Sequence, residues 1–214
     1  FFASQTLLRP CWTAFLRILR VAVNPTRHRI TAFSKARGPM FWDLRAKSLE
    51  NQSLEPIKSF EEMRGHRYSE EAALDSVVNR LKKIGEYRQL FQEAFGKTEP
   101  ITAQNLARAI ATYERTLTGG NSRFDQYMRG DENALSINEI DGMQVFLKSG
   151  CAKCHNGPML SDYKVHALGV PDNEKLPQSD AGVDNQYKFR TPSLRNLRFT
   201  APYMHSGKIK TLEQ

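Results

Sequence analysis

Two cysteines and a histidine form the most chemically specific stretch of this chain. Cys151 and Cys154 are separated by two residues, and His155 follows the second cysteine directly. This is the spacing of covalent haem attachment, in which each thiol adds to one vinyl group of the porphyrin. The histidine is then placed to bind the iron as its proximal axial ligand. The pentapeptide therefore predicts one haem c.

Two other kinds of site use such a pair of cysteines. A dithiol redox pair usually opens a helix that follows a strand, whereas the residues before Cys151 read as a helix. A zinc site needs two more ligands. His166 or His205 could complete a Cys2His2 set, because the third cysteine, Cys11, lies far upstream. Both alternatives stay open at this point.

A predicted helix leads directly into the cysteine motif. Ser136 and Glu139 have the spacing of a capping box, and Gly150 is placed to end the helix. Such a helix would hold the attachment loop rigid against a porphyrin edge. We interpret its apolar stripe as core, and the stripe consists of Ile140, Met143, Phe146 and Leu147.

Three further helices are predicted upstream from caps and from apolar residues at helical spacing. Ser69 and Thr102 are the expected N-caps of the first and third, and Gly85, Gly96 and Gly119 are the expected stops. We expect their apolar stripes to form a core. The stripes are Leu74, Val77, Val78, Leu81 and Ile84; Tyr87, Leu90, Phe91, Ala94 and Phe95; and Leu106, Ala109, Ile110, Tyr113 and Leu117.

The chain after His155 is punctuated by Gly and Pro and has no strong period. A large flat cofactor could supply the core that this stretch lacks. Pro158 could place a backbone carbonyl against the Nδ1 proton of His155; the alternative is an ordinary turn proline. Residues 210–214 resemble the first turn of a helix. The predicted fold class is mostly α, with cytochrome c-like haem domains and few or no strands.

Composition excludes several other classes of protein. The formal net charge is +8, but residues 1–42 hold seven of the 31 Lys and Arg and no Asp or Glu, which leaves 24 basic and 23 acidic residues elsewhere. A near-neutral body without a basic patch argues against nucleic-acid binding. No apolar run is long enough to cross a bilayer, and three cysteines do not make a disulfide scaffold.

The composition and the helix signals of the sequence divide the chain into three parts. Residues 1–38 are basic and atypical, residues 39–130 form a first helical domain, and residues 131–214 form a cytochrome c-like domain. The segment Thr6–Val23 could be a basic amphipathic helix that targets or anchors the protein. We favour the interpretation that residues 1–38 are a damaged or mis-read end.

Three stretches together resemble the bacterial di-haem cytochrome c peroxidase family, which includes the MauG-type enzymes. They are residues 41–52, the Cys151–His155 motif and residues 189–207. The resemblance implies two haems, of which an N-terminal one reduces hydrogen peroxide to water. The C-terminal haem, at Cys151, Cys154 and His155, would pass electrons inward from a small donor such as a cytochrome c or a cupredoxin.

The resemblance also implies roles for residues outside the haem motif. Trp42 matches a tryptophan between the two haems, and Gln52 and Glu62 match the polar pair at the peroxide pocket. A carboxylate in a dry pocket can carry a proton from one peroxide oxygen to the other. Read from the sequence alone, Glu62 fits a solvated helix-end carboxylate better than a catalytic one, and Trp42 could equally be a core aromatic. The backbone carbonyls of Thr200 and Pro202 match ligands of a calcium ion.

Several positions depart from the family pattern. No second Cys-x-x-Cys-His motif exists, and the residues around Cys11 cannot replace it. Leu44 stands where the family usually has Gly, and Ser206 where it usually has Asp. The sixth iron ligand would fall beyond Gln214, and the register of Met204 does not match a ligand position.

We therefore predict an incomplete copy of a periplasmic peroxidase, in which a second haem belongs to the full-length protein. The resemblance is compatible with a homodimer. Two alternatives stay open: a mono-haem electron-transfer cytochrome, and a MauG-like oxidase that acts on a protein substrate.

Overall fold

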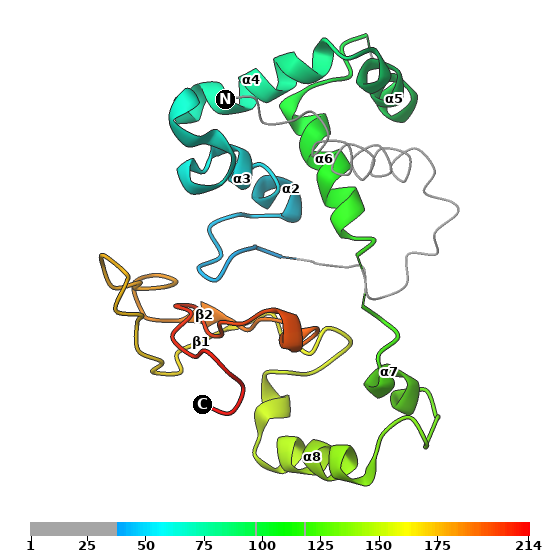
Figure 1. Ribbon diagram of the computed structural model, residues 1–214, viewed down its shortest axis with the longest axis vertical. Helices are drawn as coiled ribbons and strands as arrows, with labels where there is room; N and C mark the ends of the chain where they lie inside the picture. Colours follow the sequence, from blue (N-terminus) through cyan, green and yellow to red (C-terminus); the bar gives the residue numbers. More distant parts are fainter. Residues whose placement is uncertain (1–37, 97, 118) are drawn as a thin grey trace, which may run out of the picture. The chain divides into compact units, whose positions relative to one another are not determined.

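A computed structural model of the chain describes residues 38–96, 98–117 and 119–214 (Figure 1). The predicted helix Thr6–Val23, Cys11 and all of the atypical basic segment except Gly38 lie outside the described residues. Within them the chain is mostly helical, as predicted, and has one two-stranded sheet. None of the described helices is long and apolar enough to span a membrane.

The α-helices are α2 (Leu49–Gln52), α3 (Glu55–Lys58), α4 (Glu70–Lys82), α5 (Gly85–Phe95), α6 (Ala103–Glu114), α7 (Arg123–Met128) and α8 (Ile137–Lys148). The strands are β1 (Val165–His166) and β2 (Phe189–Arg190). The short elements are the π-helix η2 (Phe60–Arg64) and the 3-10 turns η3 (Gly65–Arg67), η4 (Cys151–Lys153) and η5 (Leu197–Phe199).

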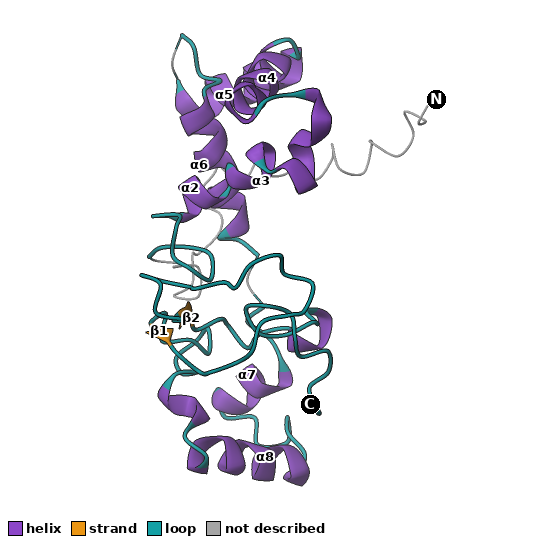
Figure 2. Cartoon of the chain, turned by 90° about the vertical axis from the view of Figure 1, so that its left-hand side faces the viewer, coloured by secondary structure: helices purple, strands orange, loops and turns teal. Residues whose placement is uncertain are grey.

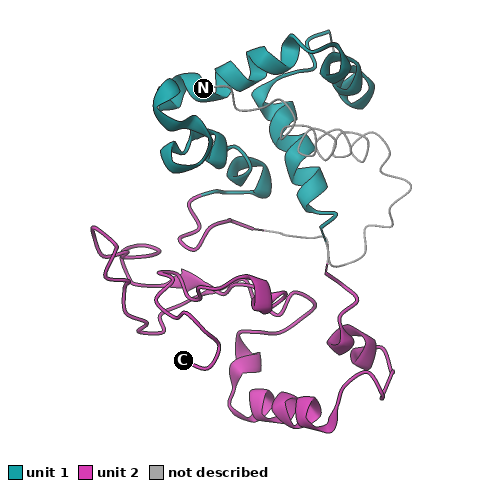
Figure 3. Cartoon of the chain, in the orientation of Figure 1, with its two compact units in different colours: residues 1–37, 46–117 teal, residues 38–45, 118–214 magenta. Residues whose placement is uncertain are grey.

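The described residues fall into two compact units (Figure 3). The helical unit holds residues 46–117, and the loop-rich unit holds residues 38–45 and 119–214. The predicted domains, 39–130 and 131–214, stay a prediction. Contacts between backbone segments place α7 in the same unit as the residues that follow it.

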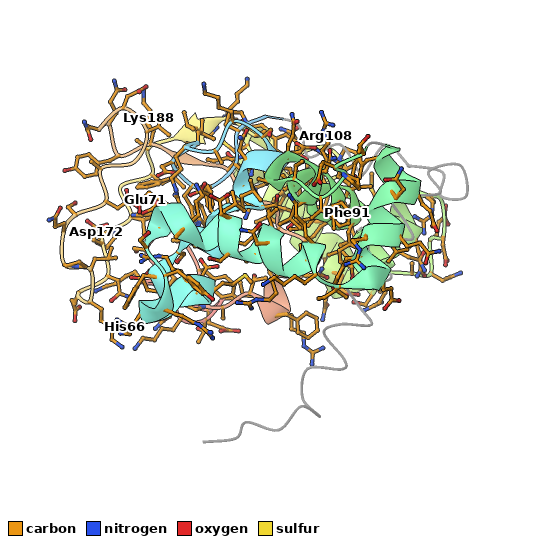
Figure 4. The ribbon with its side chains drawn as sticks, turned by 90° about the horizontal axis from the view of Figure 1, so that it is seen from above. His66, Glu71, Phe91, Arg108, Asp172 and Lys188 are labelled. Atoms are coloured by element: carbon orange, nitrogen blue, oxygen red, sulfur yellow. The ribbon has the colours of Figure 1, made fainter. Side chains whose placement is uncertain are left out.

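The helical unit has a conventional apolar core, built from α3 to α6. Phe91 is fully buried in its centre (labelled in Figure 4), and Ile101 and Leu106 are almost as inaccessible. The predicted caps are confirmed: the Ser69 hydroxyl accepts from the Ala72 N–H, and the Thr102 hydroxyl accepts from the Asn105 N–H. These caps satisfy N–H groups that a helix start leaves without partners.

Two of the predicted helix ends in this unit are wrong. The first helix ends at Lys82, and Gly85 is the first residue of α5 rather than a stop. Ile84 is the extended residue between the two helices, and it still packs against the core. At the end of α6, Leu117 is 65% exposed and lies beyond the helix. Gly96 does end α5, in the left-handed conformation.

The loop-rich unit contains α7, α8 and long irregular segments (Figure 2). Both helices begin with a capping box, as predicted for Ser136 and Glu139. In the antiparallel sheet, Val165 pairs with Arg190. The predicted final helical turn is wrong: residues 211–213 form a turn, and the Gln214 side chain accepts from the backbone N–H of Lys210.

Burial differs sharply between the two units. Among the described residues of the loop-rich unit, Ala134 is the only buried hydrophobic one, and the other buried residues are Asp125, Ser161 and Thr191. The apolar stripe of α8, predicted as core, has no buried member, and Leu147 is 51% exposed. A unit of this size normally buries a substantial apolar core. The described side chains of this unit therefore do not form an apolar core of their own.

Candidate functional site

The cysteine motif lies on one short turn after α8. Gly150 has a φ of 82°, a left-handed conformation that suits glycine, and it redirects the chain at the end of the helix. The turn is closed by the His155 N–H, which donates to the Cys151 carbonyl at 2.9 Å. Cys151 is exposed and Cys154 half-buried, and both are free thiols. The thiols are thus available for addition to a cofactor.

The His155 ring is held by a single backbone carbonyl. Its Nδ1 lies 3.0 Å from the Leu160 carbonyl oxygen. A carbonyl can only accept, so this contact places the ring proton on Nδ1 and leaves the Nε2 lone pair for a metal. The predicted carbonyl therefore exists, but Leu160 supplies it. The carbonyl of Pro158 accepts from the Arg195 Nε at 2.7 Å instead.

Arg195 ties this loop to the rest of the loop-rich unit. Its guanidinium donates to both carboxylate oxygens of Asp125, at 2.8 and 3.0 Å, and to the carbonyls of Pro158 and Gly119. The side chains of Arg195 and Asp125 are only 11% and 6% exposed. The Arg195 guanidinium holds the pKa of the Asp125 carboxyl well below its usual range. A charged, bidentate contact of this kind fixes geometry strongly.

The apolar side chains of the loop-rich unit fit a porphyrin. Large hydrophobic residues from α8, from the segment around β1 and from η5 are exposed although the unit lacks a buried core. A haem face is apolar and could be covered by such side chains. Thiol donors at the attachment spacing, a histidine with a free Nε2 and this exposed surface together satisfy what haem c requires. The exposed members include Ile137 (78%), Val145 (62%), Leu147 (51%), Leu168 (70%) and Phe199 (79%).

The structure also tests the alternative ligand set for zinc. Cys154, Asp162 and His166 bring a sulfur, a carboxylate oxygen and a ring nitrogen within 4.8 Å of one another. His205 lies elsewhere: it stacks on Phe189 at 3.7 Å between ring centroids and contacts the Asp172 carboxylate at 3.3 Å. Among the described residues, therefore, no Cys2His2 set is assembled.

The three residues matched to the peroxide pathway lie in different surroundings. Trp42 is half-buried in the loop-rich unit, where its carbonyl accepts from the Arg190 N–H at 2.9 Å. Gln52 is half-buried at the end of α2 in the helical unit. Glu62 is exposed and lies in the π-helix η2, an element often found at functional sites. The roles of the three residues stay a prediction.

Arg64 holds the segment that carries Glu62. Its Nε donates to the Lys58 carbonyl at 2.7 Å and its Nη1 to the Tyr68 carbonyl at 3.2 Å. The ring of His66 packs edge-on against Phe60, with centroids 4.6 Å apart. The helical unit has a hollow of about 500 Å³, and neither Gln52 nor Glu62 lines it. Its lining residues are Ser48, Glu50, Asn51, Leu54, Gln104, Ala107 and Arg108.

Two departures from the family pattern now have a structural context. Leu44 has a φ of 63°, in the left-handed region that glycine adopts without strain, so a leucine there costs backbone energy. The Ser206 hydroxyl donates to the Pro171 carbonyl at 3.1 Å. Thr200 and Pro202, the predicted calcium ligands, are exposed, and a cis peptide bond joins Ala201 to Pro202.

Comparison with known proteins decides the family. The profile described as "Di-haem cytochrome c peroxidase" matches residues 17–133, more than half of the chain. The chain belongs to this family. The matched residues include Trp42, Gln52 and Glu62, and they begin upstream of residue 38, inside the segment predicted to be atypical.

Individual relatives agree with that assignment. The methylamine utilization protein MauG of Methylorubrum extorquens is 39% identical over 177 residues, which are 80% of this chain and 48% of the relative. The cytochrome c551 peroxidase of Pseudomonas aeruginosa is 38% identical over 184 residues, 81% of this chain and 51% of the relative. The chain thus spans about half the length of these relatives.

A solved structure supports the fold. The crystal structure of a MauG-like protein associated with microbial copper homeostasis is 30% identical and superposes with a TM-score of 0.70. The superposition covers 83% of this chain and 57% of that one. The family is enzymatic, and its members are haem-dependent peroxidases and MauG proteins. The recognised family and the predicted fold class are therefore confirmed.

Proposed function

We propose that the loop-rich unit carries one covalently attached haem c. Cys151 and Cys154 would each add their S–H across a vinyl group, and the Nε2 of His155 would bind the iron. The observation that carries this proposal is the mismatch in burial. The described part of the unit buries one apolar residue, Ala134, while Leu147 and Phe199 stay exposed. A large flat apolar group supplies the missing centre.

When bound, the haem supplies reversible one-electron transfer at its iron. The chain's own contribution is to orient the ligand. The Leu160 carbonyl holds the His155 ring at its Nδ1 and makes Nε2 a better donor. Arg195 holds the same loop through the Pro158 carbonyl. These contacts give the ring one orientation before any cofactor binds.

The whole protein, of which this chain holds the electron-entry domain and part of the peroxidatic domain, reduces hydrogen peroxide to water. Gln52 would orient the peroxide through its amide, and Glu62 would carry a proton between the two oxygens. Glu62 is exposed in this chain, so that role requires a pocket that excludes water around it. The second haem of the full-length protein would complete this pocket.

Further features follow from the family resemblance. Trp42 would shorten the electron path between the haems, and a cytochrome c or cupredoxin would deliver the electrons. The carbonyls of Thr200 and Pro202 would bind calcium. Covalent haem attachment takes place outside the cytoplasm, which implies a periplasmic protein, and a homodimer fits the same family. The predicted split into residues 39–130 and 131–214 corresponds to the peroxidatic and electron-entry parts.

One experiment tests the division of labour. The chain is produced with haem-maturation machinery, and haem content, reduction by a reduced cytochrome c and peroxide turnover are measured together. We expect one haem per chain, reduction by the donor and little or no peroxide turnover, because one attachment motif is present. Robust turnover with one haem per chain would refute the proposal. A His155→Ala variant is the control, and it should lose the spectrum of the ligated haem.

A second candidate is a MauG-like oxidase that acts on a protein substrate. One observation favours it: the chain is about as similar in sequence to a MauG protein as to a peroxidase. Sequence identity is 39% to the MauG of Methylorubrum extorquens and 38% to the cytochrome c551 peroxidase of Pseudomonas aeruginosa. The two candidates differ in the sixth ligand, which sets the haem potential. A tyrosine as sixth ligand would favour the oxidase, and a methionine the peroxidase.

A further inference from the structure

One group of potential metal ligands shares Cys154 with the haem attachment motif and adds two residues from outside that motif. The Sγ of Cys154, a carboxylate oxygen of Asp162 and a ring nitrogen of His166 are all within 4.8 Å of one another. The Nε2 of His166 is 2.9 Å from the Oδ2 of Asp162. Their side chains are 34% and 11% exposed, so the group is partly shielded from water yet accessible to a small ion.

The backbone fixes these three residues relative to one another. The Asp162 N–H donates to the Cys154 carbonyl at 2.7 Å, which ties the two ligand positions together. The Oδ1 of Asp162 accepts from the Lys164 N–H at 2.9 Å, and Oδ2 is the oxygen turned to His166. His166 is held in β1 by its pairing with Phe189. The backbone positions of the three ligands and the Asp162 carboxylate are therefore fixed relative to one another.

The three ligand types match a zinc-like cation. Thiolate, imidazole and carboxylate bind Zn²⁺ at about 2.3, 2.0 and 2.0–2.2 Å, which puts ligand atoms about 3.3–3.6 Å apart in a tetrahedral site. In the structure all three ligand atoms lie within 4.8 Å of one another, and His166 Nε2 and Asp162 Oδ2 are 2.9 Å apart, so only small side-chain adjustments are needed to reach that range. One position would remain for water, because the described residues bring three groups together. Such an open site is typical of zinc with three protein ligands.

We propose that the haem-free chain binds one Zn²⁺ or Co²⁺ through Cys154, Asp162 and His166. Binding releases the thiol proton of Cys154, and the imidazole binds in its neutral form. The ion excludes haem attachment at the same sulfur. Once the S–H has added across a vinyl group, the sulfur carries two carbon substituents and can no longer be a thiolate. The cation and the porphyrin therefore compete for Cys154.

The test uses the full chain made without haem maturation, reduced and in a Cys11→Ser background. Co²⁺ is titrated and its thiolate charge-transfer absorption followed, and alkylation in the presence of Zn²⁺ is mapped by mass spectrometry. We expect one ion per chain and protection of Cys154 but not of Cys151. His166→Ala and Asp162→Ala should each weaken binding at least about tenfold. The matched control, His205→Ala, removes a histidine that pairs with Asp172 without a nearby cysteine and should leave affinity unchanged.

Three results would overturn the proposal. One is the absence of binding. Another is equal protection of Cys151 and Cys154 with no effect of His166→Ala, which would indicate a site made by the cysteine pair alone. The last is Co²⁺–thiolate absorption that is as strong in chain already carrying haem as in haem-free chain, because Cys154 would then not be the ligand. The proposed function has its own readout, because haem incorporation during maturation is measured without added metal.

Discussion

The ion pair between Arg195 and Asp125 gives the sharpest prediction on how the loop-rich unit is held together. Both side chains are almost inaccessible, and the guanidinium makes a bidentate contact with the carboxylate and two further bonds to carbonyls. Removing the guanidinium leaves the buried Asp125 carboxylate with only its capping contacts from Ser122, and the loss of one partner of a buried ion pair costs about 3–5 kcal/mol. We therefore expect Arg195→Met to lower the free energy of unfolding of this unit by about that amount.

The measurement is urea unfolding of the haem-loaded chain, followed by haem absorbance because the proposed haem lies in the loop-rich unit. Arg195→Lys should recover little of the loss, since an ammonium cannot make the bidentate contact. Arg198 is exposed, so Arg198→Ala should stay within about 0.5 kcal/mol of the parent. In a double-mutant cycle with Asp125→Leu, the summed losses of the two single variants should exceed that of the double variant by about 1–3 kcal/mol.

The pH dependence follows from the same pair. Arg195 lowers the pKa of Asp125 in the folded state, so the carboxylate binds its proton more readily in the unfolded chain. The stabilisation is complete above the ordinary carboxyl range and is lost as the pH falls from about 5 toward the lowered folded pKa. The difference in the free energy of unfolding between the parent and Asp125→Asn should shrink as the pH falls through that range. Two results would refute this reasoning. One is a loss of unfolding free energy below about 1 kcal/mol for Arg195→Met at neutral pH. The other is a stability difference between the parent and Asp125→Asn that grows on acidification.

Three further predictions concern the backbone, the core and turnover. Leu44→Gly should be more stable than Leu44→Ala by about 1 kcal/mol in chemical denaturation, because both remove the side chain but only glycine adopts a φ of 63° freely; equal stability would contradict the assignment of strain. Phe91→Ala should destabilise the helical unit by about 3–5 kcal/mol and leave haem attachment intact, whereas Met63→Ala, at a residue 65% exposed, should stay within about 0.5 kcal/mol of the parent; loss of haem with Phe91→Ala would show that the units do not fold separately. In the haem-loaded chain, any residual peroxide turnover should be lowered at least about tenfold by Glu62→Gln and little changed by Glu61→Gln; equal effects would remove Glu62 from the proton path.

The parts of the fold that were predictable are those with local signals. Ser69, Thr102 and Ser136 were identifiable as caps because a cap depends on residues three positions apart. The end of the first helix was not predictable in this way. Ile84 continues the apolar stripe at helical spacing, yet it reaches the core from an extended connection, so tertiary packing overrode the glycine signal at Gly85.

The support of the haem site was less predictable than its motif. The Cys151–His155 spacing is local and specific, but the Arg195–Asp125 pair joins residues 70 positions apart and leaves no sequence pattern. One local signal was available: Ser122 and Asp125 have the capping-box spacing that was recognised at Ser136. Carbonyl contacts such as that of Leu160 have no side-chain signature at all.

The burial of the α8 stripe shows a different limit. Helical spacing predicts which residues share a face, but it does not say what covers that face. Met143 and Phe146 are half-buried and Leu147 is exposed. Periodicity carries no information about a cofactor that could cover this face, so from the sequence the stripe is predicted as core.

The most direct test of the haem centre is whether the porphyrin stays on the polypeptide after denaturation. Chain produced with haem-maturation machinery is unfolded, freed of non-covalent haem and examined by absorbance and intact mass, and its thiols are then alkylated. The account predicts one haem per chain, with Cys151 and Cys154 resistant to alkylation, and loss of resistant haem in a Cys151→Ala/Cys154→Ala variant. Colourless protein whose two motif thiols both react would contradict it.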